Sequence, residues 1–251
     1  MENLKKDRSQ LVVKSNRLIQ NTRSTFTLQQ QKILLYLVSK IQPDDEEFKT
    51  YTVDLKHLCK ICNIDVHPEN YKNFRESIKN LRDKSFWLRT PEGYTTVSWI
   101  ERFWIKEESS TLEIKFDEYL KPFLLQLRAN FTAYNLEYVL LFKSAYSIRL
   151  YELLRSNLNT GKLEISLDDF RDYFMLGYKY QPYKELRRNV IEVAISEINN
   201  YTDIIISYTT ERTGHKITKL IFNISKKSHV DELHASTKRL LEFDKTLQNK
   251  N

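Results

Sequence analysis

The sequence is short of glycine, cysteine and long apolar runs, and each shortage excludes a class of protein. Only 4 of the 251 residues are glycine, which leaves little room for the glycine-rich loops that cradle phosphates. The 2 cysteines cannot build the disulfide framework of a small secreted domain. No apolar run has membrane-spanning length, and the opening MENLKKDRSQ lacks the apolar core of a secretion signal. We therefore expect a soluble intracellular protein that does not contact a membrane.

Motifs that mark an enzyme are also missing. The chain has no G-x-x-x-x-G-K-[ST] loop, no H-E-x-x-H, no G-x-S-x-G, and no H-x-H ahead of a tyrosine of the kind that a rolling-circle nickase uses. Its acidic residues do not cluster as a two-metal nuclease site requires. We predict a protein that is not an enzyme and that needs no cofactor.

One segment, residues 57–67, gathers side chains that could bind zinc. Cys59 and Cys62 form a Cys-x-x-Cys motif, and His57 and His67 flank it. The motif overlaps an amphipathic helix that needs Cys62 for its apolar face, and no second Cys-x-x-Cys or His-x-x-x-His completes the set. We therefore predict that at least one cysteine is a small buried apolar residue and that no metal binds.

Length and charge favour two domains and an anionic partner. A chain of 251 residues exceeds one average domain and is short for three. The 40 Lys and Arg outnumber the 33 Asp and Glu, which gives a net charge of +7 and an isoelectric point near 9.1. A moderate excess of this kind is compatible with nucleic acid without proving it.

The two halves of the chain repeat one pattern. VDLKHL, residues 53–58, resembles ISLDDF, residues 165–170, and the same shift (165 − 53 = 112) lays YKNFRESI over YKELRRNV. An amphipathic helix precedes each block, and in the first half Thr27 and Gln30 have the spacing of a capping box. Alternating apolar and polar residues, typical of β-hairpins, follow each block, with turns at residues 91–93, 107–110 and 212–215.

Helix, short strand, helix, helix and hairpin is the winged-helix arrangement, a variant of the helix-turn-helix. We therefore predict an α+β fold of two tandem winged-helix domains. The expected bounds are residues 11–127 for the first domain, 128–226 for the second and 227–251 for a tail helix. We expect the leading MENLKKDRSQ to be disordered.

The repeated block lies where a winged-helix domain has its recognition helix. In the second half this helix follows Pro182 and brings Lys184, Arg187 and Arg188 into its first two turns, where the helix dipole favours negative charge instead. Cations in that position indicate an anion outside the protein, because recognition helices reach base edges with their N-terminal residues. A plain solvated face is the competing interpretation. The positions expected in the core are Leu186, Val190, Val193 and Ala194.

The residues expected to contact DNA form four groups. They are Tyr183, Lys184, Arg187, Arg188 and Asn189 on the second recognition helix; Arg212, His215, Lys216 and Lys219 on its wing; Lys143 and Arg149 near the first helix of the second domain; and Lys72, Asn73, Arg75 and Lys79 on the first recognition helix. The wing and the first helix are expected to contact phosphate, which positions a protein without reading sequence. For Tyr183 the alternative is that it fastens the start of the helix.

Three ordered segments resemble the plasmid replication initiators that bind iterons, the short repeats at a plasmid origin. They are residues 11–41, 131–156 and 183–208, and the resemblance runs from about Leu11 to Ser225. It implies two tandem winged-helix domains, of which the first also dimerises. One departure is Glu76, which stands where the second copy has Arg188, so the first domain is expected to serve dimer contacts and backbone positioning more than base recognition.

The resemblance also implies the partners and the place of action. Monomers would bind direct repeats in double-stranded origin DNA, and dimers, in equilibrium with them, would repress the protein's own promoter at an inverted repeat. Host helicase and host initiator proteins would complete the machinery in the bacterial cytoplasm. A dimeric winged-helix transcriptional regulator without a replication role is the alternative function, and a strand-nicking initiator enzyme is a third.

Overall fold

The structure is a computed structural model that describes residues 2–42, 44–64, 68–106 and 110–248, without the side chains of residues 2, 3, 68–73, 247 and 248. The chain forms two compact units, Met1–Leu140 and Leu141–Asn251. This division lies further along the chain than the expected boundary after Leu127. The reason is strand β8 (Phe131–Asn135), which pairs antiparallel with β1 (Leu11–Ser15) and so belongs to the first unit.

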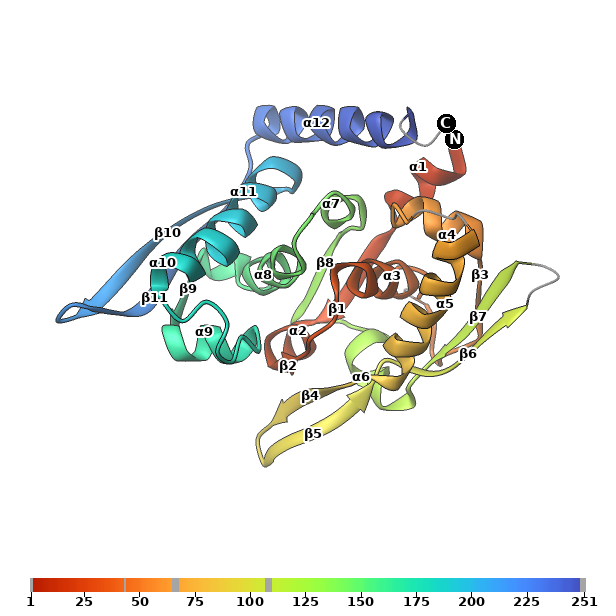
Figure 1. Ribbon diagram of the computed structural model, residues 1–251, viewed down its shortest axis with the longest axis horizontal. Coiled ribbons are helices and arrows are strands. Elements are labelled where there is room, and N and C mark those ends of the chain that lie inside the picture. The colour runs from red at the N-terminus through yellow and green to blue at the C-terminus, as the bar shows by residue number, and fades with distance from the viewer. Residues whose placement is uncertain (1, 43, 65–67, 107–109, 249–251) are drawn as a thin grey trace. The chain divides into compact units, whose positions relative to one another are not determined.

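The first unit contains three small antiparallel sheets and a set of short helices (Figure 1). Its other elements are α1 (Glu2–Arg8), α2 (Asn16–Asn21), β2 (Thr22–Arg23), α3 (Leu28–Val38), β3 (Tyr51–Asp54), α4 (Leu55–Ile61), α5 (Pro68–Asp83), β4 (Ser85–Thr90), β5 (Gly93–Ser98), β6 (Ile100–Lys106), β7 (Thr111–Phe116), η1 (Glu118–Leu120), α6 (Lys121–Leu124) and α7 (Glu137–Leu140). The sheets have the strand orders β1-β8, β2-β4-β5 and β3-β7-β6.

Helices α3, α4 and α5 with the sheet β3-β7-β6 make the winged-helix part of the first unit. Thr27 and Gln30 form the predicted capping box, in which each side chain accepts the other residue's backbone N–H. Between α5 and the wing the chain adds a second hairpin, β4–β5, which pairs with β2 instead of joining the wing sheet. The expected turn at residues 107–110 lies largely outside the described residues.

The second unit is the simpler winged helix. Its elements are α8 (Ala145–Arg155), η2 (Leu158–Thr160), β9 (Lys162–Ser166), α9 (Leu167–Tyr173), α10 (Tyr183–Leu186), η3 (Arg187–Ile191), α11 (Glu192–Tyr201), β10 (Ile204–Thr213), β11 (Lys216–Lys226) and α12 (His229–Gln248). Strand β9 pairs with β11, the second strand of the wing, in the order β10-β11-β9. The predicted α+β fold of two tandem winged-helix domains is confirmed.

The tail forms helix α12, which contacts α11. Ala235 and Phe243 are buried. Arg239 is also buried and donates a hydrogen bond to the carbonyl oxygen of Tyr201 at 3.0 Å. Because these side chains share one face of the helix, the tail is a packed part of the second unit.

The expectation of a disordered N-terminus is wrong, because residues 2–8 form helix α1. The Asp7 carboxylate connects this helix to the rest of the unit. It accepts hydrogen bonds from Lys40 Nζ at 3.0 Å and from the Tyr36 hydroxyl at 3.3 Å, and it contacts His57 Nε2. Partial burial by itself would raise the pKa of Asp7, but the hydrogen bonds and charges of Lys40 and His57 outweigh it and hold the pKa below its ordinary value.

Candidate nucleic-acid interface

The recognition helix of the second unit is continuous from Tyr183 to Tyr201 but contains one π-helical turn, η3. Pro182 is the residue before the helix rather than its first residue. Leu186, Val190 and Ala194 are fully buried, as predicted. Val193 is 38% exposed, against expectation, because the π turn inserts an extra residue and rotates the positions after it. Such turns are frequent at functional sites.

The π turn also determines the surroundings of the cations. The backbone N–H of Glu192 donates to the Arg187 carbonyl five residues earlier, and the same spacing brings Arg187 Nε to 3.0 Å from Glu192 Oε1. Both side chains are about half exposed. Lys184 and Arg188 are exposed and have no ion pair or hydrogen bond within the described part of the chain. The helix therefore presents three cations to solvent, of which one has a carboxylate partner.

Two polar residues of this helix have internal roles. The Tyr183 hydroxyl donates to the Tyr208 hydroxyl on β10 at 3.4 Å, and burial is the main cause that raises the pKa of Tyr183 above its usual range. Asn189 Nδ2 donates to the Glu185 carbonyl at 2.9 Å. Tyr183 thus fastens the helix start to the wing, which is the alternative stated for it above.

The wing tip presents its own cations. The pair Thr213–Lys216 closes the hairpin, and Gly214 has the left-handed φ of 60° that this tight turn requires. Arg212, His215 and Lys216 are exposed, and their side chains form no ion pair or hydrogen bond with the described residues. Lys219 differs, because it pairs with Glu211 at 3.0 Å and Glu164 at 3.5 Å. The Glu211 hydrogen bond and charge raise the pKa of Lys219.

Arg149, which was expected to contact phosphate, is buried instead. It is 8% exposed, Nη2 donates to the Tyr173 carbonyl at 2.8 Å, and its guanidinium lies 4.5 Å from the Tyr173 ring centre. A phosphate contact would require this buried group to leave its place, so Arg149 supports the packing of α8 against α9. Lys143 is exposed, and its backbone N–H donates to Glu197 Oε1 at 2.7 Å.

The turn between α9 and α10 carries exposed residues that were not among the expected DNA contacts. Arg171, on α9, donates from its guanidinium to three carbonyl oxygens of this turn. Tyr178, in this turn, is 95% exposed, and Lys179 beside it in the sequence is exposed too. The available signal was GYKYQP directly ahead of the recognition helix, a run with two tyrosines in a turn.

The first recognition helix, α5, buries Phe74 and Ile78, the two positions that match Leu186 and Val190 in the repeat. Arg75 and Lys79 are exposed, and Arg75 has an interaction of its own. The side chains of Lys72 and Asn73 lie outside the described residues. The helix therefore offers fewer described cations than its counterpart.

Residues 57–67 do not form a metal centre within the part of the chain that is described. No group of three or more His, Cys, Asp or Glu could hold an ion there or elsewhere in the described residues; His67 lies outside them. Cys59 and Cys62 are both buried, and burial raises the pKa of the Cys62 thiol. Among the described residues no helix is long and apolar enough to cross a membrane.

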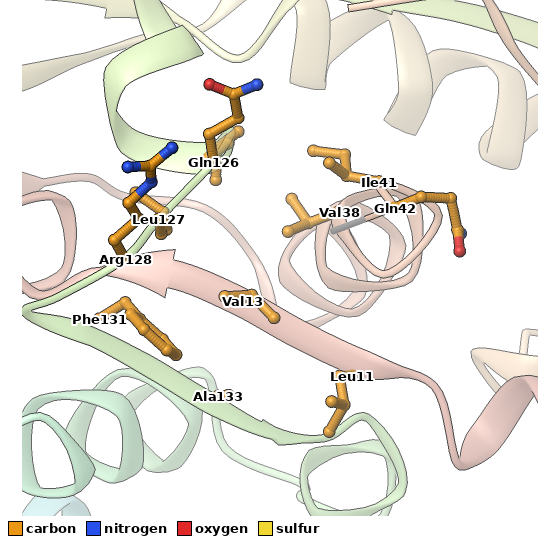
Figure 2. A pocket seen from close by; sticks show the side chains of 11 residues that line it. Leu11, Val13, Val38, Ile41, Gln42, Gln126, Leu127, Arg128, Phe131 and Ala133 are labelled. Atoms are coloured by element: carbon orange, nitrogen blue, oxygen red, sulfur yellow. The ribbon is translucent and has the colours of Figure 1, made fainter. Parts of the chain in front are cut away.

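A second candidate surface is an apolar groove on the first unit, called the β1–β8 groove below (Figure 2). It has a volume of about 470 Å³. Its lining residues are Leu11, Val13, Val38, Ile41, Gln42, Leu124, Gln126, Leu127, Arg128, Phe131 and Ala133. Leu11 and Phe131 are 51% and 41% exposed, although an apolar side chain is usually more stable when buried.

The fold is that of a tandem winged-helix protein, and its second unit presents exposed cations. Residues 11–155 match the family described as "Initiator Replication protein, WH1", and residues 166–224 match "Initiator Rep protein, WH2". The chain therefore belongs to the family of initiator replication proteins. Membership makes it a DNA-binding protein of plasmid DNA replication.

Individual relatives share no more than about a third of their aligned residues with this chain. A replication initiation protein of Escherichia coli is 28% identical over 233 residues, which cover 89% of this chain and 72% of that protein. The PI protein of Escherichia coli is 30% identical over 129 residues, or 44% of this chain and 42% of that protein. A crystal structure of domains 2 and 3 of RctB aligns with a TM-score of 0.46 at 11% identity, covering 81% of this chain and 85% of that one.

Proposed function

We propose that this chain initiates replication by binding the direct repeats of a plasmid origin sequence-specifically through its second unit. Binding opens the origin for the host helicase and host initiator proteins, and the chain performs no chemistry of its own. The observation that carries the proposal is the set of exposed cations in the first two turns of a recognition helix whose opposite face is buried.

These cations contribute little to the stability of the unit itself. The Arg187–Glu192 pair is about half exposed, and such surface pairs stabilise a protein by at most about 1 kcal/mol. Lys184 and Arg188 have no internal partner within the described chain. An arginine that forms two hydrogen bonds with a guanine, by contrast, discriminates against other bases by roughly 1–3 kcal/mol. The placement therefore favours recognition of DNA over structural support.

The wing supplies the phosphate contacts of the same interface. Arg212, His215 and Lys216 extend from a tight turn, and cations in that position neutralise phosphates without reading sequence. Lys219 contributes less, because two carboxylates already hold its ammonium group. On this proposal the helix discriminates between sequences and the wing adds affinity.

Dimerisation and autorepression are assigned to the first unit, through the β1–β8 groove. Within the described residues, sheet β1-β8 has two strands, so each strand has an open edge that can pair with another chain. A second copy of the chain is the occupant that fits, because repression at an inverted repeat requires a two-fold pair. In such a pair the same apolar surface meets itself.

Fluorescence-anisotropy titration at physiological salt tests the DNA-binding proposal. The ligands are a duplex with the replicon's direct repeat and a scrambled duplex of equal composition. We expect the repeat to bind roughly 10³-fold more tightly than the scrambled duplex. Arg187→Ala and Arg188→Ala should remove most of this ratio, while the control Lys245→Ala on α12 should leave it unchanged. Equal binding of both duplexes by the wild type would refute the proposal.

A transcriptional regulator built from the same domains is distinguished by the arrangement of its sites. It would bind one inverted repeat tightly and gain nothing from an array of direct repeats. The same titration with one, two and three direct repeats, and with the promoter's inverted repeat, separates the two functions.

A further inference from the structure

The turn between α9 and α10 is held by one arginine. The Arg171 guanidinium donates from Nη1 to the carbonyl of Tyr180 at 2.9 Å, and from Nη2 to the carbonyls of Gly177 at 3.0 Å and Lys179 at 2.7 Å. Hydrogen bonds from a charged donor are among the stronger ones in proteins. Three of them on one short turn hold its backbone in one shape.

Backbone angles and ring contacts in the turn agree with this. Gly177 and Tyr180 have φ values of 51° and 53°, in the left-handed region that non-glycine residues rarely adopt. The Tyr180 ring meets the Tyr146 ring edge-on at 6.2 Å, and Tyr146 meets Phe174 in the same way at 5.9 Å. Both ends of the turn are therefore anchored, by α9 on one side and by the start of α8 on the other.

The fixed turn holds Tyr178 away from the protein. Its side chain is 95% exposed, although a large aromatic side chain normally gains stability by covering apolar surface. The Arg171 bonds on either side of Tyr178 hold the backbone from which this ring extends. A phenol presented in this way combines an apolar ring with a hydroxyl that can donate a hydrogen bond.

The charges near Tyr178 favour an anionic partner. The hydrogen bonds of Arg171 go to carbonyl oxygens, which do not neutralise its charge. Lys179 is exposed on the same turn, and Lys184 follows at the start of the recognition helix. Lys179 and Lys184 therefore offer exposed cations to the phosphates of a DNA strand, next to the exposed carboxylates Asp172 and Glu185.

We propose that Tyr178 donates a hydrogen bond to the DNA backbone and that Arg171 is the positioning residue that fixes it there. The proposal deepens the DNA-binding function above and rests on it. Tyrosine hydroxyls are among the groups that contact phosphate oxygens in protein–DNA complexes, and such contacts fix register without reading bases. Arg171 itself need not touch DNA.

Titration of the full-length chain with the repeat and scrambled duplexes tests the role of Tyr178. Tyr178→Phe removes only the hydroxyl, and we expect it to weaken binding to both duplexes by the same factor, roughly fivefold. We expect the same loss for Tyr178→Ala. The control Tyr119→Ala removes a tyrosine that is 52% exposed on the first unit and should leave both affinities unchanged. Wild-type affinity of Tyr178→Phe would overturn the proposal, as would a loss confined to the repeat duplex.

Arg171→Lys tests the positioning role, because lysine keeps the charge but cannot hold three carbonyls in the same fork. We expect it to weaken binding about as much as Tyr178→Phe. The double variant should bind no more weakly than Tyr178→Phe alone, because both changes remove one contact. Additive losses would contradict the positioning role. Circular dichroism confirms that each variant is folded.

The outcomes separate this inference from the proposed function. If the wild type does not distinguish the repeat from the scrambled duplex, the proposed function fails. If it does, and Arg188→Ala removes the distinction while Tyr178→Phe binds normally, only the present inference fails.

Discussion

Replacing Arg149 tests whether this arginine supports the core or grips DNA. Its guanidinium is buried, donates to the Tyr173 carbonyl at 2.8 Å and lies over the rings of Tyr173 and Phe174. Arg149→Ala removes the charged donor and leaves the carbonyl without that partner. We therefore expect a loss of stability in the second unit and no direct loss of DNA affinity.

The size of the loss follows from these contacts. A hydrogen bond from a charged group contributes about 1.5–3 kcal/mol, and a cation over an aromatic ring contributes about 0.5–2 kcal/mol. A combined free-energy loss of about 3 kcal/mol lowers the urea midpoint by about 1–3 M when the slope is typical of a small domain. Arg149→Lys should lose nearly as much, because lysine cannot reproduce the planar stacking.

The assay uses the distribution of tryptophan. Trp87, Trp99 and Trp104 are all in the first unit, so tryptophan fluorescence follows that unit alone. Far-ultraviolet circular dichroism follows both. We expect Arg149→Ala to shift the circular-dichroism transition of the second unit and leave the fluorescence transition in place.

A weaker DNA affinity without a loss of stability would refute this reasoning. If Arg149→Ala unfolds at the wild-type urea concentration but binds both duplexes more weakly, with a smaller salt slope, then Arg149 contacts phosphate. The burial argument would then be wrong.

Three further predictions use the same chain. Lys216→Ala should reduce the slope of log K against log salt by about 0.9, the value for one lost phosphate contact. Lys219→Ala should reduce this slope less, because Glu211 and Glu164 already pair with that lysine. Titrations at several salt concentrations measure both slopes. Asp7→Asn should destabilise the first unit at neutral pH, and the difference from wild type should vanish in acid. The pKa of Asp7 is lowered, so its contribution is present above the ordinary value of 3.8 and is lost as pH falls through the folded value; tryptophan fluorescence in urea measures it. Phe131→Glu places a charge in the β1–β8 groove and should shift the chain toward monomer in analytical ultracentrifugation.

Each of these has an outcome that contradicts it. Equal salt slopes for the two lysine variants would mean that the Lys219 ion pairs do not persist near DNA. A stability difference between Asp7→Asn and wild type that persists below the acid transition would place the effect elsewhere than in the carboxylate charge. A Phe131→Glu variant that dimerises normally would exclude the groove as the dimer surface.

The fold was largely predictable because its signals are local and occur twice. The repeated blocks, the Thr27 capping box and the glycine turn of the second wing are each encoded within a few neighbouring residues. The pairing of the first unit's extra hairpin with β2 was not predicted, and the expected boundary after Leu127 lies ahead of the division that the structure shows. Both depend on strand pairing across more than 50 residues, as when Thr22 meets Leu88 and Leu11 meets Asn135, and such pairing leaves little trace in local sequence.

The candidate site likewise has features that the sequence predicted and features that only the structure shows. The sequence by itself determined the two tandem winged-helix domains, the recognition helix after Pro182 and its cations, because period, capping and charge position can be recognised along one chain. Only the tertiary structure decided which cations are available: it buries Arg149, pairs Lys219 with two glutamates and holds Tyr178 outward through Arg171. The physical reason is that availability depends on neighbours from other elements, and packing alone brings those neighbours together.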